Sequence, residues 1–290
     1  MRYRVTHQTD YTYAAPVSVG HNLAFLRPRD LAGQRCLGNL IDFDPVPAIT
    51  NTRTDYFGNH ATLFTVQEAH RHMSVVAVSE VEVDRAAPML PGTSMPWEQV
   101  FDGLRRDRSP AGLDALQFAF DSPLAAAQPM LTDYARVSFP PGRPILDAVY
   151  DLTHRVFTDF AYDPTTTTVS TPIDTVFAQR SGVCQDFSHV QIAMLRGLGL
   201  AARYVSGYLR TFRDRRDPKL VGADASHAWL AVYDGAGGWT GFDPTNDQVP
   251  GEHHVTAAWG RDYGDVSPVR GVIVGGGRQQ IDVKVDVRPV

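Results

Sequence analysis

Three residues of this chain could together carry out covalent catalysis: Cys184, His227 and Asp243. Cys184 lies at the start of a predicted helix, where unpaired backbone N–H groups and the positive end of the helix dipole favour a thiolate. A histidine can take and return a proton, and a neighbouring aspartate fixes its tautomer and stabilises its charged form. A nucleophile, its base and the residue that orients the base are the three parts of acyl transfer through a covalent intermediate.

The helix that would position Cys184 is predicted from hydrophobic periodicity between Arg180 and Gly199. Apolar side chains recur on one stripe of this segment, and Gly199 ends it: Cys184, Phe187, Val190, Met194 and Leu198. The pattern places Cys184 in the first turn, at the top of the buried face. An isolated cysteine at such a place is usually a buried structural residue, so position alone assigns it no role.

A hairpin brings the other two residues together. Residues 225–233 alternate as a strand, residues 234–238 form a glycine-rich turn, and residues 239–244 return as a second strand. Residue 235 is midway between His227 and Asp243, so a turn centred there makes them near cross-strand neighbours. Their Cβ atoms would then lie roughly 5 Å apart.

The remaining elements predict an α+β protein with a small antiparallel β domain in front. The first 85 residues contain short β-branched runs separated by Pro and Gly breakers: Arg2–Gln8, Val17–Leu26, Leu37–Phe43, Ala61–Val66 and Met73–Asp84. Helical patterns follow in Leu113–Phe120, after Pro144, and from Pro172 to Arg180, the last closed by Gly182 as a left-handed cap. The tail Ile281–Arg288 alternates and should pair with the N-terminal sheet.

These patterns divide the chain into four parts. We expect a β domain over residues 1–95, a connector with short helices over 96–141, a catalytic core over 142–265, and C-terminal strands over 266–290 that pack back on the β domain.

Several segments resemble the transglutaminase-like superfamily, and in particular its bacterial branch of transglutaminase-like proteins or cysteine proteases with a β-rich N-terminal domain. The resemblance covers nearly the whole chain and lies in Tyr3–Asp30, Gly182–Phe187, Ala223–Trp229, Gly238–Asn246 and Gly260–Gly271. It implies a papain-like α+β core and a catalytic triad of Cys184, His227 and Asp243.

The donors that would stabilise an oxyanion are only partly assigned by the sequence. The backbone N–H of Cys184 should provide one hydrogen bond, and a second donor is needed. Eukaryotic transglutaminases use an upstream tryptophan, but no tryptophan lies between Trp97 and Trp229. Papain-like proteases use a glutamine shortly before the cysteine, which here corresponds to Gln179. Tyr162 is the other candidate, and it is favoured because Phe160–Pro164 resembles the family's sequence.

The resemblance and the three residues imply an enzyme that acts on amide or peptide bonds of a peptide or protein through a thioester. Water as acceptor would make it an amidase or protease, and an amine would make it a transamidase. Hydrolysis is favoured, because water is the default acceptor where no amine site has been built. No metal or organic cofactor is required. The alternative is a non-catalytic peptide-binding or scaffold protein that kept the fold, although such a protein has no need of an intact triad.

Composition and the absence of long apolar segments limit the classes of partner and the cellular compartment that we expect. The 290 residues carry a net charge of −5, which argues against binding to nucleic acid or to an anionic membrane. The start of the sequence has no apolar signal region, and no apolar run is long enough to cross a bilayer, so we expect a cytoplasmic protein. Two cysteines form neither a disulfide framework nor a cysteine-rich zinc site.

Other possible sites have simpler interpretations. Asp186 and His189 are three residues apart and could share a face with a ligand, but Cys184 lies about 140° round the helix from His189, a poor geometry for a shared metal. We expect Asp186 to complement the helix dipole and His189 to pack. The pairs His70/His72 and His253/His254 are interpreted as surface or loop histidines, and Gly275–Gly277 as a turn.

Overall fold

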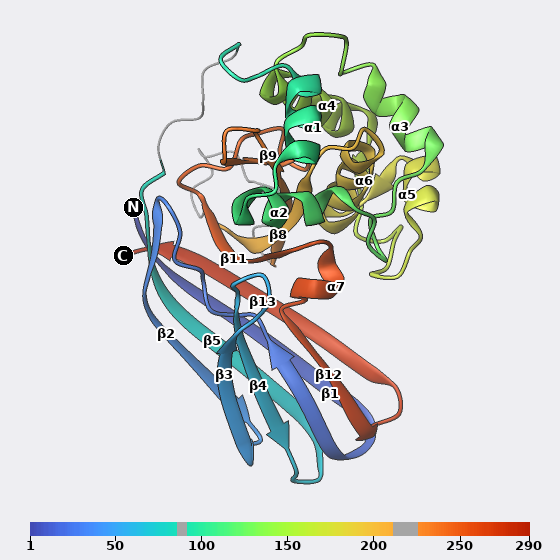
Figure 1. Cartoon of the computed structure of the whole chain (residues 1–290). Coiled ribbons are helices and arrows are strands. Elements are labelled where there is room, and N and C mark those ends of the chain that lie inside the picture. Colours follow the sequence, from blue (N-terminus) through green and yellow to red (C-terminus); the bar gives the residue numbers. More distant parts are fainter. Residues whose placement is uncertain (86–91, 211–225) are drawn as a thin grey trace.

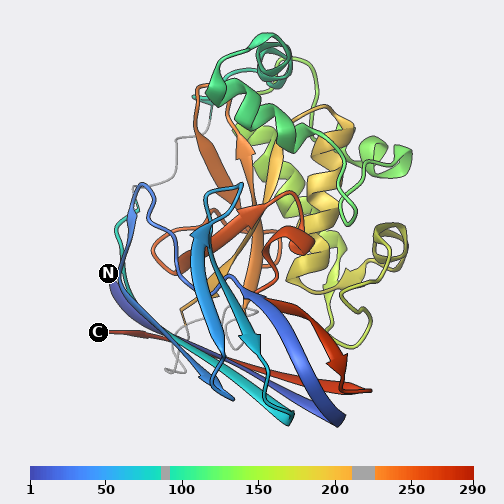
Figure 2. The ribbon, with the colours of Figure 1, turned by 60° about the horizontal axis from the view of Figure 1, so that its bottom comes forward.

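The computed structural model describes residues 1–85, 92–210 and 226–290. A large antiparallel sheet forms one end of the molecule, and a smaller sheet covered by helices forms the other (Figure 1). Both chain termini lie at the same end of the large sheet (Figure 2). The α+β class with an antiparallel β domain in front is thereby confirmed. Among the described residues, no helix is both long and apolar enough to cross a membrane.

The large sheet is built around one long central strand. In the described residues its strands are β1 (Arg2–Ala24), β2 (Gln34–Asp44), β3 (Ile49–Thr54), β4 (His60–Val66), β5 (His70–Val83), β12 (Val269–Gly275) and β13 (Gln279–Pro289). The path runs β2-β5-β1-β4-β3, and β12 and β13 also pair with β1. The first half of β1 lies between β5 and β13, and its second half lies between β4 and β12.

One prediction about this sheet was wrong, and one of its strands was not predicted. The runs Arg2–Gln8 and Val17–Leu26 belong to a single strand, because pairing on both sides carries β1 through Ala15–Pro16. A register shift against β5 between Thr12 and Val17 absorbs the break. Strand β3 was not predicted: all six of its side chains are exposed, so no alternation of burial marks it in the sequence.

The second body places helices against a four-stranded sheet of order β10-β9-β8-β11. Its described strands are β8 (Ala202–Leu209), β9 (His227–Tyr233), β10 (Trp239–Phe242) and β11 (His254–Gly260), with a short parallel pair β6 (Ala161–Tyr162) and β7 (Ser181–Gly182). The helices are α1 (Trp97–Arg106), α2 (Pro110–Leu116), the 3-10 turn η1 (Gln117–Ala119), α3 (Pro129–Arg136), α4 (Ile145–Asp159), α5 (Ile173–Gln179), α6 (Cys184–Gly197) and α7 (Tyr263–Val266).

Helix α6 is the centre of this body. It packs against β8 and β9 on one side and against α3, α4 and α5 on others, so every residue from Cys184 to Arg196 is buried. The apolar stripe predicted for this helix is therefore only part of its buried surface. Such complete enclosure makes the positions of its first-turn side chains rigid.

Side-chain amides join the two bodies along the free edge of β11. Gln34 donates to the carbonyl of Thr256 and accepts from its N–H, both at 2.8 Å, and Asn59 pairs in the same way with the backbone of Trp259, both at 2.9 Å. The Arg29 guanidinium lies 3.4 Å from the centroid of the Trp259 ring. Because β11 is an edge strand, these amides complete hydrogen bonds that a further strand would otherwise provide.

We predict that Asn59→Ala lowers the free energy of unfolding by about 3 kcal/mol, since it leaves the partly buried backbone N–H and C=O of Trp259 without their side-chain partners. Chemical denaturation measures this value. Thr50→Ala on exposed β3 is the control and should change the stability by less than about 0.5 kcal/mol. Equal stabilities of the two variants would show that the amide bridge does not hold the bodies together.

Candidate active site

Cys184 is the first residue of α6 and is buried. The start of the helix is held by Asp186, whose Oδ2 accepts from the Val183 N–H at 2.9 Å and from the Thr167 hydroxyl at 2.7 Å. A Cβ on Gly182 would lie 2.6 Å from this oxygen, so only glycine permits the cap. The left-handed residue that ends α5 is Arg180, with φ of 53°, and not Gly182 as predicted.

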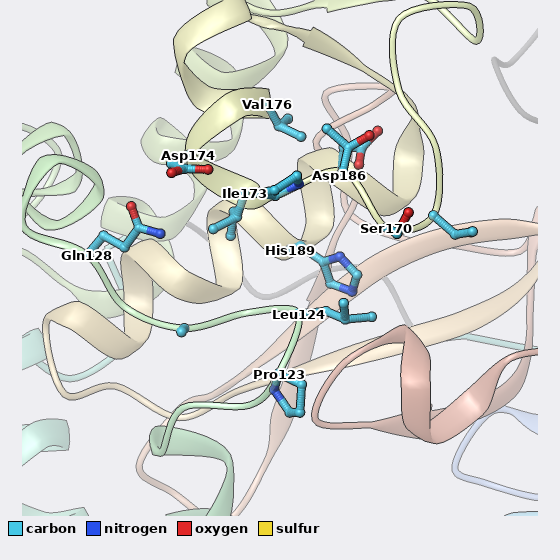
Figure 3. A pocket seen from close by; sticks show the side chains of 13 residues that line it. Pro123, Leu124, Gln128, Ser170, Ile173, Asp174, Val176, Asp186 and His189 are labelled. Carbon is cyan, nitrogen blue, oxygen red and sulfur yellow. The ribbon is translucent and has the colours of Figure 1, made fainter.

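Asp186 and His189 line a cavity of their own beside α6 (Figure 3). Asp186 has the capping role expected from its place in the first turn. The buried His189 accepts a hydrogen bond at Nε2 from the Tyr263 N–H, at 3.1 Å. Cys184 does not border this cavity, so the two residues do not share a site with the thiol.

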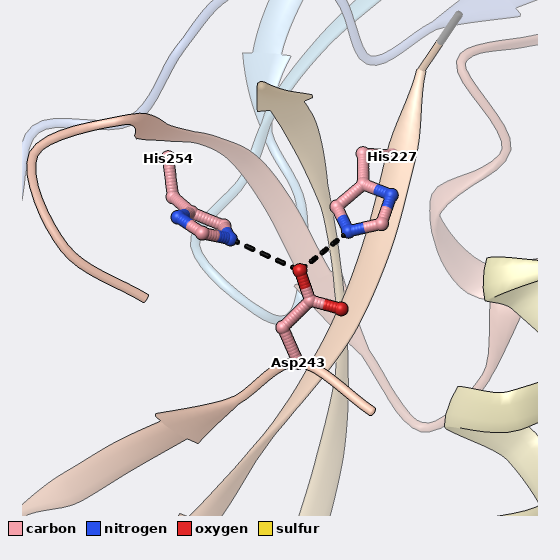
Figure 4. Close-up of side chains that lie close together, drawn as sticks. All are labelled: His227, Asp243 and His254. Atoms are coloured by element: carbon pink, nitrogen blue, oxygen red, sulfur yellow. Dashed lines mark hydrogen bonds and ion pairs between the residues drawn. The ribbon is translucent and has the colours of Figure 1, made fainter. Parts of the chain in front are cut away.

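His227 and Asp243 meet at the hairpin of β9 and β10 (Figure 4). The pair Trp239–Tyr233 centres the turn on residue 236, one residue beyond the predicted centre, and Asp243 lies just after β10. It is therefore level with Trp229, two residues from His227 on the same face of β9. The side chains still meet: His227 Nε2 and Asp243 Oδ2 are 2.8 Å apart, and both are fully buried. Motif residues 223–225 lie outside the described residues.

A second histidine contacts the same carboxylate. His254, the first residue of β11, places Nε2 3.2 Å from Asp243 Oδ2 and is 1% exposed. The prediction of a surface histidine was wrong for this residue. Its polar neighbours Glu252 and His253 indicated a loop, and the only sequence signal against it was that the apolar segment 255–259 follows directly.

The turn after β10 adds two further donors to Asp243. The backbone N–H of Thr245 lies 3.0 Å from Oδ1, and the side-chain amide of Asn246 lies 2.9 Å from Oδ2. Burial by itself would raise the pKa of Asp243, but His227 and His254 outweigh it and hold the pKa well below its ordinary value. The carboxylate is therefore ionised at neutral pH.

The two histidines carry different charges. Burial lowers the pKa of His227, but Asp243 and Cys184 raise it more, to about 10, so this ring is an imidazolium at neutral pH. Burial lowers the pKa of His254 to about 4, and Asp243 offsets only part of that effect. His254 is neutral, and its contact with a carboxylate requires the proton on Nε2.

The free ring nitrogen of His227 is directed to the proposed nucleophile. Nδ1 is buried and, apart from Cys184, has no hydrogen-bond partner in the part of the chain that the structure describes. Cys184 is close enough to raise the pKa of this imidazole. Nε2 therefore holds the orienting carboxylate, and Nδ1 is the nitrogen available for proton exchange.

His227, Asp243 and His254 could also be considered as metal ligands. One donor atom of each lies within 4.8 Å of the donor atoms of the other two. Tetrahedral ligands about 2.0 Å from a zinc ion are separated by about 3.3 Å. The 2.8 Å contact between His227 and Asp243 is shorter than this and typical of a charge-assisted hydrogen bond. The arrangement fits hydrogen bonding better than metal coordination.

Of the two candidate oxyanion donors, Tyr162 lies nearer the start of α6. Strand β6 pairs it with Gly182, and the next residue, Asp163, donates its N–H to the Gly182 carbonyl at 2.9 Å. Burial raises the pKa of Tyr162, and Cys184 raises it further. Gln179 is exposed at the last position of α5.

Comparison with known proteins places the chain in a family. Residues 3–82 match the bacterial transglutaminase-like N-terminal region, and residues 135–244 match the transglutaminase-like superfamily. An uncharacterized protein of Mycobacterium tuberculosis is 41% identical over 293 residues, covering 99% of this chain and 93% of the relative. The chain belongs to the transglutaminase-like superfamily.

Other relatives extend this assignment. An uncharacterized protein of Mycobacterium leprae is 33% identical over 295 residues, covering 99% of this chain and 98% of the relative. The crystal structure of a candidate cysteine protease from Cytophaga hutchinsonii superposes with a TM-score of 0.76 at 20% identity, covering 99% of this chain and 90% of that one. The N-terminal β region and the transglutaminase-like core thus occur together in one fold.

We predict that Asp243→Asn lowers the pKa of His227 from about 10, because the carboxylate no longer opposes burial and only Cys184 still raises it. A raised histidine pKa stabilises the fold fully below pH 6.5, and that contribution is lost as the pH rises through about 10. The variant should therefore lose this contribution at a lower pH than wild type does. NMR titration of the ring gives the pKa, and thermal unfolding between pH 6 and 10 gives the stability profile.

The matched control is the exposed pair His154–Asp247, whose Nδ1 and Oδ2 are 2.7 Å apart. Asp247→Asn should change the titration of His154 and leave that of His227 as it is. If the pKa of His227 is the same in Asp243→Asn as in wild type, the Asp243 carboxylate does not determine the charge of His227.

Proposed function

We propose that this protein is a cysteine-dependent acyl-transfer enzyme that cleaves amide or peptide bonds through a thioester. The observation that carries the proposal is the fully buried, charge-assisted hydrogen bond between His227 and Asp243. The imidazole of His227 lies close to Cys184, the first residue of α6. The superfamily supports a cysteine-enzyme fold, and the individual roles are our assignment.

In the first half-reaction the Cys184 sulfur, as a thiolate, attacks the carbonyl carbon of the substrate. The electrons of the C=O bond move to its oxygen, which accepts hydrogen bonds from the Cys184 N–H and from the Tyr162 hydroxyl. When the tetrahedral intermediate collapses, the C–N bond breaks and His227 Nδ1 gives its proton to the leaving nitrogen. An amine departs, and the acyl group remains on sulfur as a thioester.

In the second half-reaction a water molecule attacks the thioester carbonyl. His227, now neutral, takes the proton of the water at Nδ1, and the C–S bond breaks to release a carboxylic acid and the thiolate. Asp243 keeps the Nε2 proton in place and stabilises the imidazolium in both steps. His254 acts as a positioning residue, because it holds the Asp243 oxygen that His227 uses.

We favour hydrolysis over transamidation, with a peptide or protein amide as the substrate. Water requires no dedicated binding site, whereas an amine acceptor would need one. A non-catalytic peptide-binding protein is the competing possibility. Such a protein would not need a fully buried imidazolium beside a carboxylate. Removing two charges from water costs free energy, which argues that the charge of His227 serves catalysis.

Thiol reactivity tests the nucleophile. We predict that iodoacetamide labels Cys184 faster than Cys36 in the native protein at neutral pH, and that His227→Ala slows labelling of Cys184 at least tenfold. Burial raises the pKa of Cys36, which lies in the β domain, so Cys36→Ser should leave both labelling and activity near wild type. Cys184→Ala should abolish cleavage of a peptide library. Slow, His227-independent labelling would favour the non-catalytic alternative.

Tyr162→Phe tests the second oxyanion donor. We predict a fall in kcat of about a hundredfold with little change in KM, because the hydroxyl would act mainly in the transition state. Gln179→Ala, at an exposed position of α5, is the matched control and should keep its kcat. The opposite pattern of losses would reassign the donor to Gln179. Both variants can be compared by intact-mass kinetics of acyl-enzyme formation.

A further inference from the structure

Two buried polar side chains on α6 direct atoms without protein partners into the cavity beside that helix. The cavity has a volume of about 340 Å³ and lies between α5, the start of α6 and the segment 123–128 (Figure 3). Asp186 is 4% exposed and His189 is 5% exposed. Asp186 borders the cavity and uses Oδ2 for its cap, whereas Oδ1 has no hydrogen-bond partner among the described residues.

The chemistry of His189 is determined by its other nitrogen. Nε2 accepts the Tyr263 backbone N–H, which can only donate. Burial lowers the pKa of His189 to about 4, so the ring is neutral at pH 7, and its single proton must lie on Nδ1. Nδ1–H has no acceptor in the described residues, and His189 borders the cavity. A protonated nitrogen cannot ligate a metal ion, so this group is a hydrogen-bond donor.

The cavity thus presents a fixed acceptor and a fixed donor on neighbouring turns of one helix. A ligand that satisfies both must itself carry an acceptor and a donor. An ammonium group would satisfy Asp186 but leave the His189 donor unpaired, and a carboxylate would be repelled by Asp186 and by the nearby Asp174. A primary carboxamide satisfies both groups, with its oxygen at His189 and its nitrogen at Asp186.

Part of the remaining lining fits the aliphatic part of such a ligand. Leu124, Ile173 and Val176 provide apolar side chains, whereas Gln128, Ser170 and Thr171 add uncharged polar groups. Among the described residues that line the cavity, none is Lys or Arg. Its volume suits a small organic ligand or one amide side chain. We infer that the cavity beside α6, bordered by Asp186 and His189, is a binding site for a neutral primary carboxamide, separate from the site of Cys184.

Three probes of nearly equal size test this inference: propionamide, propionate and propylammonium. We expect only propionamide to saturate, seen as a shift of the His189 Nδ1–H signal in NMR titrations of the full chain. His189→Met, which removes the donor, should weaken binding at least tenfold, and His189→Gln, which restores an N–H donor, should recover part of it. Ala126→Phe, which fills the cavity from the segment 123–128, should abolish binding if His189→Met does not fold.

Cys184→Ala separates this site from the proposed catalytic one. Propionamide should bind that variant as it binds wild type, so failure of the proposed enzyme activity would leave this result unchanged. Stronger binding of propionate or propylammonium overturns the inference. So does propionamide binding that is lost in Cys184→Ala, or that is unaffected by the changes at both His189 and Ala126.

Discussion

A single buried carboxylate, that of Asp243, is the constraint on which the site depends. An ion removed from water costs several kcal/mol unless hydrogen bonds and opposite charge compensate it. Asp243 obtains this compensation from three parts of the chain: His227 on β9, His254 on β11, and the turn with Thr245 and Asn246. The smaller sheet must therefore bring the starts of two of its strands and the end of a third to one point.

The N-terminal β domain contributes to this geometry although it supplies none of the proposed catalytic residues. Gln34 and Asn59 complete the hydrogen bonds of β11, the edge strand whose first residue is His254. Strand β13 at the end of the chain pairs along β1 at its beginning. The position of His254 is thus linked to a sheet that holds both chain termini, which explains physically why the β region and the core form one unit.

Helix α6, which is buried from Cys184 to Arg196, borders both proposed sites. One side of its first turn places Cys184 beside His227, and another directs Asp186 and His189 into a separate cavity. Asp186 belongs to both arrangements, since one of its oxygens caps the helix that begins at Cys184 and the other borders the cavity. A ligand at Asp186 would therefore contact the residue that holds the start of this helix.

The sequence by itself determined the elements whose causes are local. Helical periodicity placed Cys184 in a first turn, and glycine-rich turn chemistry brought His227 and Asp243 onto one hairpin, with the turn centre one residue from the predicted position. Tertiary structure decided the features that depend on residues far away in the sequence. These are the continuity of β1 as one strand, the formation of the exposed strand β3, the position of Tyr162 beside Gly182, and the burial of His254 against Asp243. The hydrophobic pattern of a short segment indicates which face of a helix or strand is buried. It does not indicate which distant strand or side chain packs against that face, because this depends on the tertiary fold.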